Sequence, residues 1–355
     1  IVTGCSNRII NAHHSIRNRK LGMNAQMNKT GYGHEMILAV SSLKPPHPRY
    51  RGRFAPSPTG PLHAGSLASA LGSWLDARAN QGAWLVRIED LDVPRCIPGM
   101  DQHILAQLQA CGLIWDEEVI WQSHRLKAYQ SALETLYSDR QIYPCICSRQ
   151  QITSLLSAQG KLRARNQEQV YPGTCRNGHV WQAQLPKDSS ASAWRLAIKP
   201  DQRVRFTDAE LGLLEQDLNS DVGDFVLRRA DGIVAYQLAV VVDDAQQGIT
   251  HIVRGADLLS NTARQIYLQG ILGYPRPEYR HLPLVLDPHG EKLSKQTQAT
   301  QINTASNEAV LDALQAAALH LDLGELSGGQ DRTIAEWLLR ATHAWTDRTK
   351  RLSPT

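Results

Sequence analysis

Residues 53–66 read RFAPSPTGPLHAGS, and this segment constrains the fold of the chain more than any other. Pro56, Pro58 and Pro61 fix backbone torsions and stop the stretch from continuing a regular strand or helix. After it, apolar residues recur with helical spacing until Gly82. The segment therefore predicts the end of a strand, a stiff loop and the start of a helix.

The start of that helix is a candidate phosphate site. We expect Ser66 to be the N-cap and Gly65 to let a ligand approach the backbone closely. The first amides of a helix carry partial positive charge, and His63 can donate a hydrogen bond to a phosphate oxygen. A His-x-Gly sequence by itself is more often a capped surface helix, so the surrounding residues must decide between the two.

Acidic residues follow the next predicted strand, an apolar run over residues 83–90 that is typical of a parallel sheet. Ligands of open α/β sheets bind beyond the carboxyl ends of the strands, where Glu89, Asp90 and Asp92 lie. A carboxylate there can hold an ammonium group, and an ordinary acidic loop is the alternative. Arg53, on the first strand, can give a carboxylate two parallel hydrogen bonds.

The second half of the chain contains two more apolar segments. Residues 233–242 predict a strand that ends in two aspartates, and residues 251–259 predict a strand, a glycine turn and a helix start. Tyr236 and Arg254 lie in these segments. Without further information, Tyr236 would be a core tyrosine and Arg254 a paired residue at a strand end.

Two lysines frame a short loop at residues 291–296, which read EKLSKQ. Two cations held over a triphosphate would stabilise the charge that builds on a leaving pyrophosphate. Two lysines near a turn are usually just solvated. Lys292 and Lys295 therefore indicate a nucleotide site only in combination with the first motif.

The two motifs together resemble the nucleotide signatures of class I aminoacyl-tRNA synthetases, which are usually called HIGH and KMSKS. Here they read HAGS at 63–66 and KLSKQ at 292–296, with Leu293 for methionine and Gln296 for serine. The sequence of residues 53–60, RFAPSPTG, resembles that of the glutamyl-tRNA synthetases within this class. The resemblance covers residue 51 to about residue 340, and it implies an α/β, Rossmann-like catalytic domain with a parallel sheet that uses ATP, Mg²⁺ and glutamate.

The resemblance also implies roles for individual residues. The residues of the implied glutamate site are Arg53, Ser57, Glu89, Tyr236 and Arg254. The residues of the implied ATP site are His63, Gly65, Ser66 and Lys295, and those of the implied catalytic set are His63, Lys292 and Lys295.

A zinc site is expected in the middle of the chain. Of the six cysteines, Cys145, Cys147 and Cys175 have a spacing that suits a structural metal, but it is weak evidence by itself because residues 148–170 intervene. A fourth ligand is needed; the resemblance implies Tyr171, and His179 is a substitute. No signal peptide precedes the catalytic region, so we expect a cytoplasmic protein without a disulfide framework.

Five parts of the chain are expected. They are a disordered or spurious N-terminal extension (1–49), the first half of the nucleotide-binding catalytic domain (50–143), an insertion with the zinc site (144–195), the second half of the catalytic domain (196–298) and a helical C-terminal lobe (299–355). In the lobe, Ala309, Val310, Leu314 and Ala318 are expected to share one helix face, and Ile334, Leu338, Leu339 and Ala341 another.

The short C-terminal part narrows the expected function. The chain ends at residue 355, so 59 residues follow Gln296. A separate domain usually needs on the order of 100 residues, which leaves no room for an anticodon-binding domain. The resemblance is therefore to the shortened paralogues of glutamyl-tRNA synthetase. It implies activation of glutamate and its transfer to the queuosine base in the anticodon loop of tRNA(Asp).

Three alternatives stay open at this point. The chain could be a compact glutamyl-tRNA synthetase that charges a tRNA 3′ end, a non-catalytic paralogue that binds tRNA or a metabolite, or another nucleotidyltransferase. The net charge of +4 allows a nucleic-acid partner without proving one, and 42% hydrophobic residues suffice for a sizeable core. No apolar run reaches membrane-spanning length, and a monomer is the default expectation.

Overall fold

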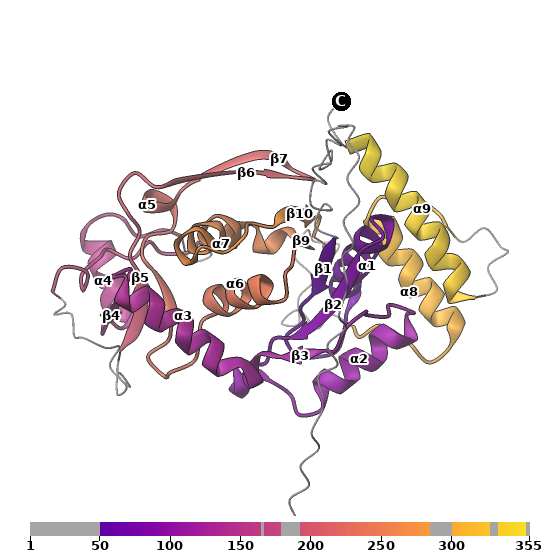
Figure 1. Cartoon of the computed structure of the whole chain (residues 1–355), viewed down its shortest axis with the longest axis horizontal. Coiled ribbons are helices and arrows are strands. Elements are labelled where there is room, and N and C mark those ends of the chain that lie inside the picture. Colours follow the sequence, from indigo (N-terminus) through magenta and orange to yellow (C-terminus); the bar gives the residue numbers. More distant parts are fainter. Residues whose placement is uncertain (1–49, 165–166, 179–191, 285–299, 327–332, 353–355) are drawn as a thin grey trace, which may run out of the picture. The chain divides into compact units, whose positions relative to one another are not determined.

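The fold is taken from a computed structural model that describes residues 50–164, 167–178, 192–284, 300–326 and 333–352 (Figure 1). Its strands are β1 (Arg51–Phe54), β2 (Ala83–Ile88), β3 (Ile120–Trp121), β4 (Ile142–Cys145), β5 (Ala193–Leu196), β6 (Arg203–Asp208), β7 (Gly212–Asp217), β8 (Phe225–Arg228), β9 (His251–Gly255) and β10 (Glu278–Leu282). Its α-helices are α1 (Ala64–Ala79), α2 (Met100–Ala110), α3 (Leu126–Ser138), α4 (Arg149–Ala158), α5 (Leu218–Asp221), α6 (Tyr236–Gln246), α7 (Leu259–Leu272), α8 (Asn307–His320) and α9 (Ile334–Leu352). Three short 3₁₀ turns within these residues are η1 (Val93–Arg95), η2 (Gln122–Arg125) and η3 (Ala256–Leu258).

The strands that position the site are parallel, as predicted. β1, β2 and β3 form one parallel group, and β9, β10 and β6 form another, to which β7 adds an antiparallel edge. The two groups meet where β1 lies beside β9, and the Thr250 amide donates to the Arg51 carbonyl at 3.0 Å. Ligands of such sheets bind where the strand order reverses, which here is the carboxyl end of β1 and β9.

Helices α8 and α9 cover α1, so the C-terminal helices belong to the same core as the first βαβ unit (Figure 1). Trp337 and Trp345 of α9 are fully buried in it. The predicted helices are therefore present, but the predicted face of α9 is wrong in one position. Leu339 is 60% exposed, because the helix buries the side of Trp337, Leu338 and Ala341 instead.

The strand predicted over residues 233–242 is wrong, because most of this run forms helix α6. Val240, Val241 and Val242 are all buried, as are both aspartates that follow them. A helix that is covered on nearly every side has no polar face, so its sequence looks like that of a buried strand. The helix brings Asp243 and Asp244 into the interior rather than to a strand end.

The segment with the cysteines is built on a separate antiparallel sheet in which β5 lies between β4 and β8. Residues 1–49, His179 and the loop of Lys292 and Lys295 lie outside the described residues, and the domain boundaries given above stay predictions. Within the described segments, no helix combines the length and the apolar character needed to cross a membrane.

Candidate active site

A cavity of about 760 Å³ opens at the carboxyl ends of β1, β2 and β9. It is lined by every site residue of the predicted glutamate and nucleotide sites that the structure describes: Arg53, Ser57, His63, Gly65, Ser66, Glu89, Tyr236 and Arg254. The other two predicted site residues, Lys292 and Lys295, lie outside the described residues. Side chains from segments about 200 residues apart thus share one cavity.

His63, rather than the predicted Ser66, is the N-cap of α1. The His63 Nδ1 atom accepts hydrogen bonds from the amides of Gly65 at 3.2 Å and Ser66 at 3.4 Å. Ser66 completes a capping box, because its Oγ accepts from the His63 amide at 2.8 Å. Since Nδ1 is an acceptor, the neutral imidazole carries its proton on Nε2. The residue therefore caps the helix through Nδ1 and also lines the cavity.

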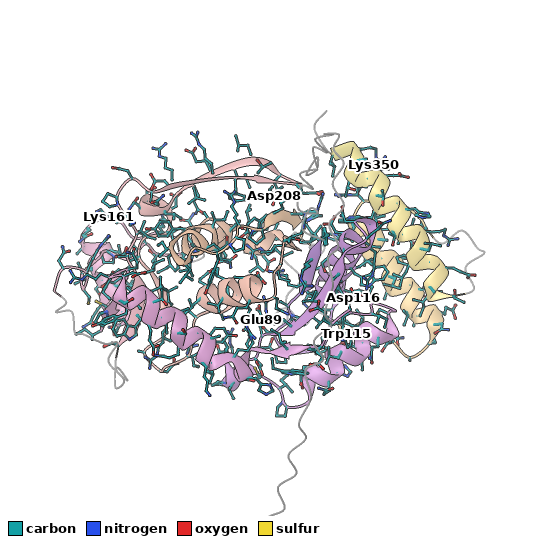
Figure 2. All side chains as sticks on the ribbon, in the orientation of Figure 1. Glu89, Trp115, Asp116, Lys161, Asp208 and Lys350 are labelled. Atoms are coloured by element: carbon teal, nitrogen blue, oxygen red, sulfur yellow. The ribbon has the colours of Figure 1, made fainter. Side chains whose placement is uncertain are left out.

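Arg53 and Glu89 of the cavity wall belong to a buried network of ion pairs. Asp244 accepts from Arg53 Nε at 3.2 Å and from Arg87 Nη1 at 2.8 Å. Arg87 Nη2 also lies 3.3 Å from Glu89 Oε1. Burial raises the pKa of Glu89, and the charges of Arg87 and Arg53 oppose that rise. Glu89, which Figure 2 labels, therefore contacts Arg87 and also lines the cavity.

A second buried aspartate completes this network. Asp243 accepts from Arg125 Nε at 2.7 Å, from Gln122 Nε2 at 2.8 Å and from the Tyr129 hydroxyl at 2.8 Å. Its carboxylate also lies 3.8 Å from Arg87 Nε. The connected network pairs three guanidinium groups with three carboxylates and is therefore neutral overall.

Arg254 stands apart from that network. Its Nε donates to His281 Nε2 at 3.1 Å, its Nη1 to Gln265 Oε1 at 2.8 Å and its Nη2 to Thr262 Oγ1 at 2.8 Å. Among the described residues, no carboxylate forms an ion pair with it within 4.0 Å. A guanidinium has five N–H groups, so one on each Nη is left for a ligand. Arg254 therefore adds one positive charge to the cavity.

Tyr236 begins α6 and lines the cavity. Burial raises the pKa of its hydroxyl, and the charges of Arg254 and Arg53 act against that rise while Glu89 adds to it. The tyrosine is thus in the cavity wall rather than only in the core.

Of the two other acidic residues singled out in the sequence, one has a structural role. Asp90 accepts from the Ser123 amide at 2.8 Å and hydroxyl at 2.6 Å, and so holds the η2 turn. Asp92 lies at the cavity and pairs with Arg95 at 2.7 Å and Arg229 at 3.2 Å. Asp92 thus links two arginines, and all three residues line the cavity.

Arg87 and Asp244, which support the cavity residues Glu89 and Arg53, were not predicted from the sequence. Arg87 is a charged residue inside an apolar strand, and Asp244 ends an apolar run. A fully buried charge is rarely tolerated without a partner, so a charge in such a place signals an ion pair. The sequence therefore indicates that Arg87 and Asp244 have charged partners, but it does not identify those partners.

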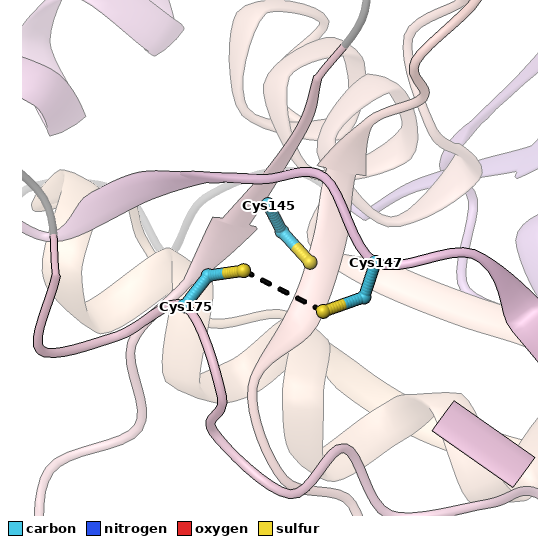
Figure 3. Close-up of side chains that lie close together, drawn as sticks. All are labelled: Cys145, Cys147 and Cys175. Carbon is cyan, nitrogen blue, oxygen red and sulfur yellow. Dashed lines mark hydrogen bonds between the residues drawn. The ribbon is translucent and has the colours of Figure 1, made fainter. Parts of the chain in front are cut away.

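The predicted zinc ligands converge in the structure. The Sγ atoms of Cys145, Cys147 and Cys175 all lie within 4.8 Å of one another (Figure 3). The Tyr171 hydroxyl lies 3.3 Å from Cys145 Sγ and 3.5 Å from Cys147 Sγ, and it accepts from the Cys175 amide at 2.9 Å. Sulfur atoms on one tetrahedral zinc are roughly 3.8 Å apart, and oxygen and sulfur roughly 3.5 Å. The donor set and its spacing therefore fit a zinc ion.

Comparison with known proteins gives the family. The family model for the catalytic domain of class I tRNA synthetases (E and Q) matches residues 49–321. A glutamyl-Q tRNA(Asp) synthetase of Cupriavidus metallidurans is 52% identical over 302 residues, which cover 84% of this chain and 92% of that protein. A protein of the same name from Burkholderia cenocepacia is 53% identical over 85% of this chain and 98% of its own length.

Solved structures agree with these matches. A glutamate tRNA ligase from Elizabethkingia meningosepticum in complex with its amino acid has a TM-score of 0.65 at 25% identity, over 82% of this chain and 64% of that one. A glutamate-tRNA synthetase from Elizabethkingia anophelis has a TM-score of 0.59 at 30% identity, over 70% of this chain. This chain spans about half the length of the latter, 53%. The chain belongs to the class I tRNA synthetases of the E and Q family, and its parallel sheet is part of their catalytic domain.

Proposed function

We propose that the enzyme activates glutamate with ATP and transfers it to the queuosine base in the anticodon loop of tRNA(Asp). The observation that carries the proposal is the convergence of Arg53, Glu89, Tyr236 and Arg254 on one cavity beside His63. The family membership and the names of relatives at 52% and 53% identity support the reaction and the acceptor.

The charge of the cavity suits glutamate. The neutral network of three arginines, two aspartates and Glu89 leaves Arg254 as an additional cation. Glutamate near neutral pH carries two carboxylates and one ammonium group, a net charge of minus one. In this proposal Arg254 and Arg53 bind the side-chain carboxylate, Glu89 binds the ammonium group, and Tyr236 and Ser57 complete the pocket.

ATP occupies the other part of the cavity, at the start of α1. His63 donates from Nε2 to a phosphate oxygen, and Gly65 lets the nucleotide approach the backbone. Mg²⁺ arrives as part of the ATP complex. Lys292 and Lys295, which lie outside the described residues, neutralise the triphosphate.

The chemistry needs positioning more than covalent help from the protein. The glutamate α-carboxylate attacks the α-phosphorus, a carboxylate–phosphorus bond forms, and the bond to pyrophosphate breaks. A hydroxyl oxygen of the acceptor base then attacks the activated carbonyl carbon, the bond from that carbon to the phosphate oxygen breaks, and AMP leaves as the hydroxyl loses its proton to the departing phosphate or to water. A base of a single-stranded loop can be splayed out to reach such a pocket. In this proposal the enzyme works in the cytoplasm, where it meets glutamate, ATP and tRNA, and it works as a monomer.

Zinc has a structural role in this proposal. Cys145, Cys147, Cys175 and Tyr171 hold the ion, which pins the β4 segment to the loop near Tyr171. The three cysteines and the tyrosine belong to a small cluster of their own, outside the larger cores. Metal binding therefore contributes folding free energy where little apolar area is buried.

Two measurements test the proposal. Glutamate-dependent exchange of pyrophosphate into ATP, with and without tRNA, should occur with the wild-type protein. After incubation with labelled glutamate and tRNA(Asp) that contains queuosine, cleavage of the tRNA should leave the label on the anticodon fragment.

Other outcomes identify the alternatives. Label on the 3′ fragment would identify a compact glutamyl-tRNA synthetase and overturn the proposed acceptor. Absence of exchange under all conditions would identify a non-catalytic paralogue. A tRNA(Asp) that lacks queuosine is the matched control, because it offers the same 3′ end without the acceptor base.

A further inference from the structure

We propose that Asp208 and His281 are positioning residues, which orient Arg254 for its ligand without touching the ligand themselves. The inference rests on the proposed function, because it assigns Arg254 to the glutamate pocket. Neither Asp208 nor His281 lines the cavity, whereas Arg254 does. Figure 2 labels Asp208, whose strand β6 pairs with β10, the strand of His281.

The three side chains form a continuous buried chain of hydrogen bonds. The Asp208 Oδ2 atom lies 2.6 Å from His281 Nδ1, and Arg254 Nε lies 3.1 Å from His281 Nε2. The exposed fractions are 2% for Asp208, 1% for His281 and 4% for Arg254. No room is left for the imidazole to turn away from either partner without disturbing the packing.

The contacts define the protonation state of the ring. A carboxylate accepts and an arginine N–H donates, so His281 must carry its proton on Nδ1 and accept at Nε2. Burial lowers the pKa of His281, which favours this neutral form. A protonated ring would point an N–H from Nε2 at Arg254 Nε–H, and the bond would be lost.

Asp208 is itself firmly held. Its Oδ1 atom accepts from the amides of Glu210 at 3.0 Å, Leu211 at 3.1 Å and His281 at 3.2 Å. These bonds shape the turn that joins β6 to β7, so the carboxylate cannot move toward Arg254. Asp208 is therefore a fixed acceptor that sets both the position and the tautomer of the ring.

The register of the parallel strands brings Asp208, His281 and Arg254 together. His281 on β10 is the direct cross-strand partner of Arg254 on β9, and Asp208 on β6 is the partner of Tyr279. Directly opposite residues on neighbouring strands point to the same face, so the ring and the guanidinium meet because of the strand register. Thr262 of α7 completes the support, with its Oγ1 3.1 Å from His281 Nε2 and 2.8 Å from Arg254 Nη2.

This arrangement has a consequence for binding. A carboxylate in direct contact with Arg254 would compete with the carboxylate of a ligand. The imidazole replaces that contact with a neutral acceptor, so Arg254 is oriented through Nε while an N–H on each Nη stays available. The ring thus preserves both the direction and the charge of the guanidinium for the substrate.

Two substitutions of His281 distinguish orientation of Arg254 from a role in packing alone. In His281→Asn the shorter amide can still donate to Asp208, but it loses the acceptor for Arg254. In His281→Gln the longer amide can still accept from Arg254, but it loses the donor to Asp208. Asp208→Asn is a third variant, because its amide can donate to Nδ1 and thereby drive the ring proton to Nε2, toward Arg254.

Glutamate-dependent pyrophosphate exchange gives the readout, with KM for glutamate and for ATP measured separately. We expect His281→Asn and Asp208→Asn to raise KM for glutamate by about tenfold or more, since each loses a hydrogen bond to a charged group. His281→Gln should stay within about threefold of the wild type, and KM for ATP should change little in all three.

Three results would overturn the inference. They are equal effects of His281→Asn and His281→Gln, an unchanged KM for glutamate in all variants, and a parallel rise of both KM values, which would indicate general loss of structure. Far-ultraviolet circular dichroism and thermal unfolding identify variants that fail to fold. If the wild-type protein shows no glutamate-dependent exchange, the proposed function fails instead, and the two failures are thus distinguished.

Discussion

Arg87 on β2 and Asp244 on α6 form an ion pair with 2.8 Å between Nη1 and Oδ1, and their side chains are 0% and 2% exposed. Asp244 also holds Arg53 of β1 through both of its oxygens, at 3.2 and 3.4 Å. One carboxylate of α6 therefore binds an arginine of β1 and an arginine of β2. These two pairs join segments that are 157 and 191 residues apart, and Arg53 carries the connection to the cavity wall.

Removal of this carboxylate's charge should destabilise the protein strongly. Asp244→Asn takes the ion pair from the buried Arg53 guanidinium and leaves Arg87 with only its longer contacts to Glu89 and Asp243, so we expect the free energy of unfolding to fall by about 3–5 kcal/mol. Urea denaturation measures the change. The control is Glu117→Gln, which breaks an exposed pair with Arg51 and should cost about 1 kcal/mol or less. Equal losses in the two variants would contradict the role given to Asp244.

The first half of the site was predictable from the sequence because its signals are local. The loop with three prolines, the helix after it and the strand that Glu89 follows all lie within 40 residues, and all are present in the structure. The N-cap was misplaced by three residues. A histidine can cap a helix through Nδ1, but it is not among the residues that capping rules favour.

The second half was less predictable for a physical reason. α6 is buried on nearly every side, so its apolar run carries no helical period that would distinguish it from a strand. The pairs of Asp244 and the contact between His281 and Arg254 depend on tertiary structure and strand register. A single sequence does not contain those distances, although buried charges in apolar segments indicate that partners exist.

Arg254→Lys tests the glutamate site. A lysine keeps the charge but cannot reproduce the planar fork or the three bonds to His281, Gln265 and Thr262. We expect KM for glutamate to rise by roughly 10- to 100-fold, as for the loss of one hydrogen bond to a charged group, with KM for ATP nearly unchanged. Steady-state pyrophosphate exchange measures both. A rise confined to KM for ATP would place Arg254 in the nucleotide site instead.

Metal analysis tests the cysteine cluster. The purified protein should contain about one zinc per chain, and Cys147→Ser or Cys175→Ser should lose most of it. Cys96→Ser is the matched control, since Cys96 lies outside the cluster. We expect the loss of zinc to lower Tm by several degrees in the cluster variants, in line with a stabilisation of a few kcal/mol. Full zinc content in both cluster variants would rule out these ligands.

The pH dependence of stability should report on His281. An unfolded histidine has a pKa near 6.5, whereas burial lowers the pKa of His281 in the folded protein. As the pH falls from about 6.5 toward the folded-state pKa, the unfolded chain binds more protons, and the free energy of unfolding falls. His281→Gln should flatten this slope by up to about 1.4 kcal/mol per pH unit.

Urea denaturation at several pH values between about 5 and 7 measures that slope. Burial lowers the pKa of His251 as well, so a His251→Gln variant should remove a second part of the pH dependence of the free energy of unfolding. The effects should add, because the two residues do not contact each other. Identical slopes for wild type and His281→Gln would show that the ring is not held neutral by its surroundings.

His63 has two separable functions, and two substitutions distinguish them. His63→Asn keeps a side-chain acceptor for the Gly65 and Ser66 amides, because asparagine is a favoured N-cap, but it removes the donor on Nε2. His63→Ala removes both and should also cost about 1 kcal/mol of stability. If the donor stabilises charge on ATP during the reaction, both variants should lose kcat by roughly 100-fold. If His63→Asn retains wild-type turnover while His63→Ala is merely less stable, the imidazole serves the helix alone, and the nucleotide must be stabilised by other groups.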